Sequence, residues 1–191
     1  LTDGLPVEVH THNDFGMEVA TELAGIAAGA DCVHSCINGL GERTGNAALE
    51  ELIVGMKILM GLPNEYNLRI LPDVCEKVAQ ISGIQLAPNK PVSGIRNYTR
   101  ESGIGINLVQ EKPLAMFATD PALYGKSGII ALGKKSGKAS VEYFLDKLHL
   151  EATSDEITEI LARVKSMGQE EKRLLTEEEF LGIYESVRKS A

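Results

Sequence analysis

In the segment Val7-Glu-Val-His-Thr-His-Asn-Asp14, Val7 and Val9 occupy odd positions and His10 and His12 occupy even positions. Because successive side chains of a strand point to opposite faces, this pattern predicts a strand in residues 7–12 with both histidines on one face. Two histidines two residues apart on one face can share a metal ion, and Glu8 lies on that face too. From spacing alone, hydrogen-bonded structural histidines remain the alternative.

Strand and helix patterns alternate through the first 60 residues. Asn13 and Asp14 are typical turn and helix-cap residues, and residues 17–28 carry an alanine-rich apolar stripe at helical spacing. Residues 32–37 read as a second strand, with His34 as a structural residue, and Asn46 reads as the cap of a helix ending near residue 60. This order predicts parallel βα units, an α/β fold.

Two βα units cannot cover and close a parallel sheet. The chain also opens without an initiator Met, in what reads as a loop and strand. We therefore expect a fragment or a processed chain whose remaining strands lie outside this sequence.

A glycine-rich loop, Asn38-Gly-Leu-Gly-Glu-Arg-Thr-Gly-Asn46, follows the second predicted strand. Such a loop can present backbone N–H groups, Arg43 and Asn46 at the end of the sheet. A phosphate cradle at the next helix N-terminus is one alternative, although the loop lacks the Lys-Ser/Thr of a P-loop. A plain glycine-rich turn is the other.

The pattern changes after residue 62. We expect three segments: residues 1–62 with the βα units, a linker or lid in residues 63–112, and a helical region in residues 113–191. A helix is predicted from Lys138 to Leu148, and two further helices begin at the capping boxes of Thr153 and Thr176. The basic Lys134-Lys-Ser-Gly-Lys138 precedes the first of these helices, where it either binds phosphate or carboxylate groups or is a solvated cap.

Composition excludes several classes of protein. The net charge of −8 argues against nucleic-acid binding, which depends on basic phosphate contacts. No apolar run reaches the roughly 18 residues of a membrane helix, and no signal peptide is recognisable. Three cysteines without a CxxC pair indicate reduced thiols and a cytoplasmic location.

The motifs His10-Thr-His-Asn-Asp-Phe-Gly16 and Ile37-Asn-Gly-Leu-Gly-Glu-Arg-Thr-Gly-Asn-Ala-Ala-Leu-Glu50 closely resemble a known family. They are similar to the last two βα units of the 2-isopropylmalate, homocitrate and citramalate synthases, (β/α)8 TIM-barrel metalloenzymes related to hydroxymethylglutaryl-CoA lyase. The likeness extends through Glu101-Ser-Gly-Ile104 and Leu132-Gly-Lys-Lys-Ser-Gly137 and covers roughly residues 5–185. It therefore implies a C-terminal part of a barrel followed by a mainly helical accessory region.

The resemblance implies an acyltransferase of amino-acid biosynthesis that condenses an acyl-CoA with a 2-oxo acid. His10, His12 and Asn46 would bind one divalent metal, Mg, Mn or Zn, which polarises the ketone. The remaining Asp ligand and its neighbouring Arg would lie in the absent first six strands, so we expect this chain alone to be inactive. Arg43, Lys134 and Lys138 are candidates for substrate binding, and family members form homodimers.

One position departs from the family pattern. The synthases continue the Glu101-Ser-Gly-Ile104 segment with a catalytic histidine, where this chain has Gly105. Glu101, Tyr98 and Tyr124 are the candidates to replace it. The departure leaves open a divergent synthase, a lyase resembling hydroxymethylglutaryl-CoA lyase or an acyltransferase of another substrate, and a non-catalytic member that binds ligands without turnover.

Overall fold

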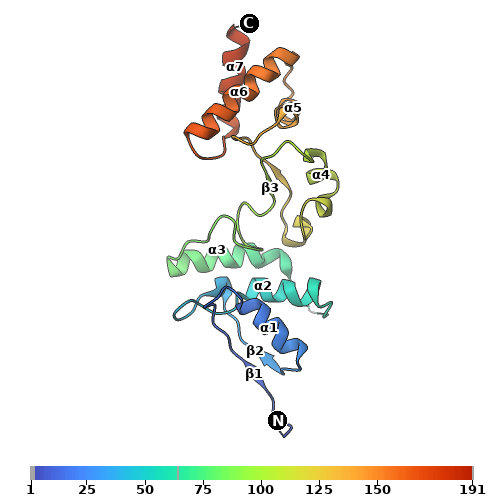
Figure 1. Ribbon diagram of the computed structural model, residues 1–191, viewed down its shortest axis with the longest axis vertical. Coiled ribbons are helices and arrows are strands. Elements are labelled where there is room, and N and C mark those ends of the chain that lie inside the picture. The colour runs from blue at the N-terminus through green and yellow to red at the C-terminus, as the bar shows by residue number, and fades with distance from the viewer. Residues whose placement is uncertain (1–2, 64, 191) are drawn as a thin grey trace. The chain divides into compact units, whose positions relative to one another are not determined.

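The computed structural model describes residues 3–63 and 65–190 and divides into two compact units (Figure 1). Unit 1 comprises residues 1–97 and 123–125, and unit 2 comprises residues 98–122 and 126–191. The segment boundaries expected at residues 62 and 112 remain predictions, and the outer ones at residues 1 and 191 lie outside the described residues.

Unit 1 is built on a parallel pair of short strands. Glu8 of one strand lies opposite Cys32 of the other, and Val9 lies opposite Val33. The predicted order of strand, helix, strand and helix is thereby confirmed. In chain order the elements are β1 (Glu8–Val9), α1 (Glu18–Ala27), β2 (Cys32–Val33), η1 (Ile37–Gly39), α2 (Leu49–Val54), the π-helical η2 (Gly55–Leu59), η3 (Leu68–Ile70) and α3 (Leu71–Ser82).

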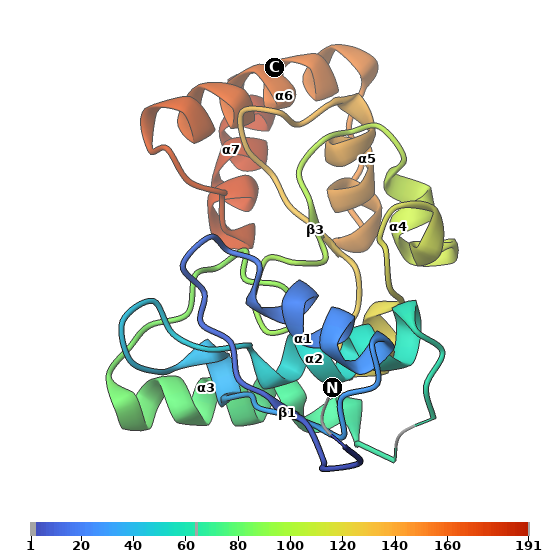
Figure 2. The same cartoon turned by 60° about the horizontal axis from the view of Figure 1, so that its bottom comes forward.

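Small residues let α1 approach its neighbours closely. A Cβ added to Gly25 of α1 would lie 3.1 Å from Cγ2 of Val9, so the helix backbone sits directly over β1. A Cβ on Gly55 would lie 2.9 Å from Cδ1 of Leu23, at the contact of α1 with η2. Figure 2 shows α1 beside α2 in unit 1. These contacts fix the helix that follows β1 against the sheet.

Both strands of unit 1 are shorter than predicted. β1 ends at Val9 because the next N–H along the same edge, that of Thr11, donates to the side chain of Glu22 instead of to a strand. The predicted strand in residues 32–37 is reduced to β2 and an isolated bridge between Cys36 and Ala48.

The predicted helix caps of unit 1 are wrong. Met17 occupies the N-cap position of α1 without a side-chain bond, and Asp14 pairs with Arg43. Ala48 occupies the N-cap position of α2, and the amide of Asn46 is directed toward His10 and Thr11. In both cases the polar side chain that was expected to cap a helix, Asp14 or Asn46, bonds instead to a residue far away in the sequence.

Unit 2 combines a second parallel strand pair with four helices among the described residues. The elements are β3 (Thr99–Arg100), α4 (Ile106–Glu111), η4 (Pro113–Ala115), β4 (Ile129–Ile130), α5 (Lys138–Lys147), α6 (Ser154–Glu170) and α7 (Glu177–Ser190), with η5 (Pro121–Tyr124) at the division between the units. Helix α6 packs against both α5 and α7 around fully buried Ile160, Val164 and Phe180 (Figure 2).

Both capping boxes predicted in unit 2 are confirmed. The N–H of Thr153 donates to Glu156 at 2.6 Å, and the N–H of Glu156 donates to the Thr153 hydroxyl at 3.3 Å. Thr176 and Glu179 make the same reciprocal pair at 2.8 and 3.2 Å. Every helix within the described ranges is too short or too polar to cross a membrane.

Candidate metal centre

Three predicted ligands meet at the end of β1. Nε2 of His10 lies 3.2 Å from Nδ2 of Asn46, and the rings of His10 and His12 are 5.2 Å apart, edge to face. The backbones of His12 and Asn46 form an isolated antiparallel bridge. The structure therefore brings together His10, His12 and Asn46 from segments more than 30 residues apart.

The glycine-rich loop wraps closely around Asn46, which is buried. Asn38, Gly39 and Gly45 all have positive φ (62°, 68° and 88°), so the loop depends on left-handed backbone conformations. A Cβ on Gly41 would lie 1.9 Å from Oδ1 of Asn46. Only glycine at position 41 allows the loop backbone to approach the asparagine this closely.

Hydrogen bonding sets which ring nitrogen each histidine presents. Nδ1 of His12 lies 3.1 Å from the carbonyl oxygen of Gly45, an acceptor, so the Nδ1 carries the proton and Nε2 keeps its lone pair. The Nδ2 of Asn46 donates toward Nε2 of His10 and also to the carbonyl of Thr11 at 3.1 Å. Both imidazoles are therefore suited to bind a metal through Nε2.

The donor set fits a divalent cation with one adjustment. Neutral imidazoles and an amide oxygen are ordinary ligands for Mg, Mn or Zn sites. Asn46, however, presents Nδ2 to His10, and an amide nitrogen is a donor group that does not bind such cations. Its amide would have to turn so that Oδ1 replaces Nδ2 in order to serve as the third ligand.

A second polar cluster adjoins His10, and local sequence spacing gives no sign of it. Nδ1 of His34 lies 3.2 Å from Nδ1 of His10, and Nε2 of His34 lies 3.4 Å from Oε2 of Glu8. The ligand-type atoms of Glu8, Cys32 and His34 are all within 4.8 Å of one another, on exposed side chains. The parallel register was the missing signal: with Val9 opposite Val33, His10 and His34 occupy the next matching positions.

A charged network contacts Asn38, the first residue of the glycine-rich loop. The N–H of Asn38 donates to the buried carboxylate of Glu50 at 3.0 Å. Lys90 forms ion pairs with Glu51 at 2.7 Å and Glu50 at 3.5 Å. Burial opposes the charge of Lys90, but its hydrogen bond to Glu51 and the two carboxylate charges outweigh burial and raise its pKa. Burial, aided by the charge of Glu50, raises the pKa of the Cys75 thiol to about 12.

Arg43 lies beside this centre but points to another partner. Its Nη2 donates to Oδ2 of Asp14 at 2.8 Å, and both side chains are about half exposed. Arg43 also has a positive φ of 61°. The pair links the glycine-rich loop to the turn that follows His12.

Four other predicted site residues belong to unit 2, whereas the candidate Tyr124 belongs to unit 1 and is buried. The Tyr98 hydroxyl is 2.7 Å from that of Thr119, and only 7% of Tyr98 is exposed. Glu101 accepts a hydrogen bond from the N–H of Lys135 at 2.9 Å. Lys134 and Lys138 are exposed, and Lys138 lies 3.8 Å from Glu142 in the first turns of α5.

Gly105 has a structural role of its own. It occupies the N-cap position of α4 with φ of 75°, the left-handed region that favours glycine. A Cβ there would lie 3.0 Å from Sδ of Met116 and 3.1 Å from its Cε. Met116 thus fills the space into which a side chain at position 105 would extend.

Comparison with known proteins identifies both halves of the chain. Residues 1–78 match the HMGL-like family, and residues 92–172 match the homocitrate synthase post-HMGL domain-like family. Homocitrate synthase AksA of Methanopyrus kandleri is 41% identical over 89% of this chain, and the probable 2-isopropylmalate synthase of Ignicoccus hospitalis is 39% identical over 96%. The chain belongs to this synthase family. A putative (R)-citramalate synthase, CimA of Archaeoglobus fulgidus, is also 38% identical over 96% of the chain.

The present chain spans less than half the length of each of the three relatives named above. It covers 43% of the homocitrate synthase, 46% of the 2-isopropylmalate synthase and 37% of the citramalate synthase. The candidate metal centre lies within the HMGL-like segment, and Tyr98, Glu101 and Gly105 lie within the post-HMGL segment.

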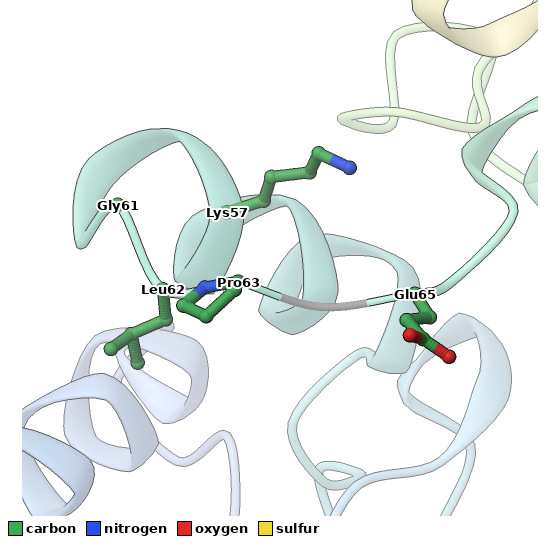
Figure 3. Close-up of a pocket in the computed structure, with 5 residues that line it drawn as sticks. All are labelled: Lys57, Gly61, Leu62, Pro63 and Glu65. Atoms are coloured by element: carbon green, nitrogen blue, oxygen red, sulfur yellow. The ribbon is translucent and has the colours of Figure 1, made fainter.

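A pocket of about 470 Å³ lies where η2 ends (Figure 3). None of the residues that line it belongs to the candidate metal centre of His10, His12 and Asn46. The pocket lining consists of Lys57, Gly61, Leu62, Pro63 and Glu65.

Proposed function

We propose that the chain is the C-terminal part of a divalent-metal-dependent synthase that condenses an acyl-CoA with a 2-oxo acid. One observation carries this proposal: His10 and His12 present Nε2 lone pairs next to Asn46 at the end of a parallel strand. Active sites of TIM barrels lie at this end of the strands. The parallel β1–α1–β2 order supports the assignment of residues 1–62 to the last two units of a (β/α)8 barrel.

The chain's own residues would hold the cation and orient the substrate. His10, His12 and Asn46 supply the ligands, and bound Mg, Mn or Zn would polarise the ketone of the 2-oxo acid. Arg43, at the rim of the loop, would pair with a substrate carboxylate after release from Asp14. The further Asp ligand and its neighbouring Arg would come from outside this chain, which is why the fragment alone would be inactive.

The accessory region would contribute to acyl-CoA binding, in a homodimer. Lys134 and Lys138 flank the N-terminus of α5, where helix N–H groups and lysines together favour phosphate. Glu101 is a stronger candidate than Tyr98 for the missing acid/base, because Tyr98 is buried and its hydroxyl is engaged with Thr119. The boundaries at residues 62 and 112 belong to this proposal.

The test uses the complete protein. Its metal content is measured after purification, and release of free CoA thiol is followed with a panel of acyl-CoAs and 2-oxo acids. His10→Ala and His12→Ala should remove bound metal and turnover, whereas His149→Ala, an exposed histidine in unit 2, should change neither. If both active-site variants keep their metal, the proposed centre is wrong.

Gly105 favours a second candidate function, a member that binds its ligands without turnover. Glycine has no side chain to transfer a proton, and the left-handed φ and the nearby Met116 disfavour any side chain at this position. This candidate predicts acyl-CoA or 2-oxo acid binding by calorimetry together with no thiol release. Cleavage of a hydroxyacyl-CoA in the same assay would instead indicate lyase chemistry.

A further inference from the structure

We propose that His34 is a positioning residue that, together with Glu8, fixes the tautomer of the metal ligand His10. This inference rests on the proposed function, since it concerns the same centre. Its basis is a continuous line of polar atoms from Glu8 Oε2 to His34 Nε2 (3.4 Å), from His34 Nδ1 to His10 Nδ1 (3.2 Å), and from His10 Nε2 to Asn46 (3.2 Å).

The contact with Glu8 favours one tautomer of His34. A carboxylate only accepts hydrogen bonds, so a neutral His34 with its proton on Nε2 suits the 3.4 Å contact with Glu8. In that tautomer Nδ1 of His34 is an acceptor, and the facing Nδ1 of His10 is the donor. His10 then keeps a lone pair on Nε2, the nitrogen that faces Asn46.

Metal binding through Nε2 of His10 requires the same tautomer, with the proton on Nδ1. A histidine that binds a cation through Nε2 as a neutral ligand carries its proton on Nδ1, and that N–H needs an acceptor. Among the described residues, the hydrogen-bond partner of His10 Nδ1 is His34 Nδ1.

The backbone explains why this arrangement is stable. β1 and β2 run parallel and in register, and the N–H of His34 donates to the carbonyl of Val9 at 3.0 Å. The offset of 24 residues that pairs Glu8 with Cys32 also sets His10 beside His34. The ring centroids of His10 and His34 lie 5.3 Å apart with 70° between the ring planes, a T-shaped arrangement.

A competing role for His34 is ligation of its own cation, with Glu8 and Cys32. The two roles are exclusive at one atom: Nε2 of His34 either donates to Glu8 or binds a metal. Cys32→Ser distinguishes them, because it removes a thiolate ligand without touching the line of atoms from Glu8 to His10.

The decisive experiment reads the tautomer directly, in the metal-free complete protein with 15N-labelled histidine. Imidazole 15N chemical shifts, assigned by comparison with His10→Ala, should show His10 protonated at Nδ1. His34→Leu removes the acceptor that faces His10 Nδ1 and should weaken Zn²⁺ binding by about 10- to 100-fold, because the Asn46 amide must turn away from donating to Nε2 when the metal binds. His34→Gln should restore much of the affinity, since its amide can donate to Glu8 and accept from His10. Cys32→Ser should change neither measurement.

The outcomes separate the two proposals. If His10→Ala leaves Zn²⁺ affinity unchanged, the metal centre itself is wrong. If His10→Ala abolishes binding while His34→Leu keeps the Zn²⁺ affinity of the wild type, the centre stands and the role of His34 is overturned. Loss of a Co²⁺–thiolate absorption band in Cys32→Ser would likewise overturn it in favour of a separate Glu8–Cys32–His34 site.

Discussion

The carboxylate of Glu22 in α1 holds Thr11, the residue between the two metal-type histidines. Oε1 of Glu22 accepts from the N–H of Thr11 at 2.9 Å and lies 2.7 Å from its hydroxyl, and Glu22 is fully buried. The helix thus supplies the hydrogen bonds that a neighbouring strand would otherwise provide.

Glu22→Ala should therefore destabilise the fold and disturb the histidines. Loss of a charged acceptor for a backbone N–H costs about 1.5–3 kcal/mol in the free energy of unfolding, measurable by urea denaturation. Glu22→Gln keeps an oxygen acceptor and should lose less. Glu76→Ala, on the exposed face of α3, is the control and should stay within about 0.5 kcal/mol of the wild type. Equal stability of Glu22→Ala and this control would contradict the prediction.

Gly41→Ala should weaken metal binding because its Cβ would lie 1.9 Å from Oδ1 of Asn46, forcing the buried asparagine or the loop to move. We expect Zn²⁺ affinity to fall by about 10-fold or more, measured by competition with a chromogenic chelator. Gly182→Ala meets no atom within 4 Å in α7 and should instead stabilise the protein by up to about 1 kcal/mol. Unchanged affinity in Gly41→Ala would show that Asn46 is not a ligand.

The cysteines of unit 1 should differ in reactivity at pH 8. Cys32 is exposed, whereas Cys75 is buried and its pKa is raised to about 12, chiefly by burial. Since the thiolate is the reactive form, brief treatment with iodoacetamide should label Cys32 and leave Cys75 unmodified until denaturant is added. Peptide mass spectrometry gives the extent of labelling at each position. Comparable labelling of Cys32 and Cys75 in the native protein would refute the prediction.

Glu179 should make the stability of α7 depend on pH in acid. The hydrogen bond from Arg173, followed by that from the N–H of Thr176, lowers the pKa of Glu179 from 4.5 to about 2. Because the folded-state pKa is depressed, the stabilisation is fully present above about pH 4.5 and is lost as the pH falls toward 2. Glu179→Gln should lower the melting temperature at pH 6 but make little difference near pH 2. Glu178→Gln removes an exposed charge from the same turn and is the matched control. A constant difference between wild type and Glu179→Gln across this range would count against the assignment.

Local patterns predicted most elements because the responsible interactions are short in sequence. The alternation at residues 7–12 and the alanine-rich stripe at 17–28 correspond to β1 and α1, and the reciprocal bonds of Thr153 and Thr176 form three residues away. Helix α5 begins at its predicted first residue and ends one residue before its predicted limit.

Predictions failed where a polar side chain has a partner far along the chain. Asp14 and Asn46 look like helix caps locally, but Arg43 lies 29 positions from Asp14, and His10 lies 36 positions from Asn46. His34 reads as structural for the same reason, since its distance from His10 depends on strand register. The grouping of His10, His12 and Asn46 came from the family resemblance, and their role as ligands remains a prediction.

Gly105 and Met116 together bear on how easily the chain could accept a histidine at position 105. The left-handed backbone disfavours any side chain there, and the end of Met116 lies 3.0–3.1 Å from where its Cβ would point. A single change of Gly105 to histidine would therefore meet backbone strain and would require the Met116 side chain to shift. A smaller residue at position 116 would relieve the second of these costs but not the first, so the effects of substitutions at the two positions should depend on each other.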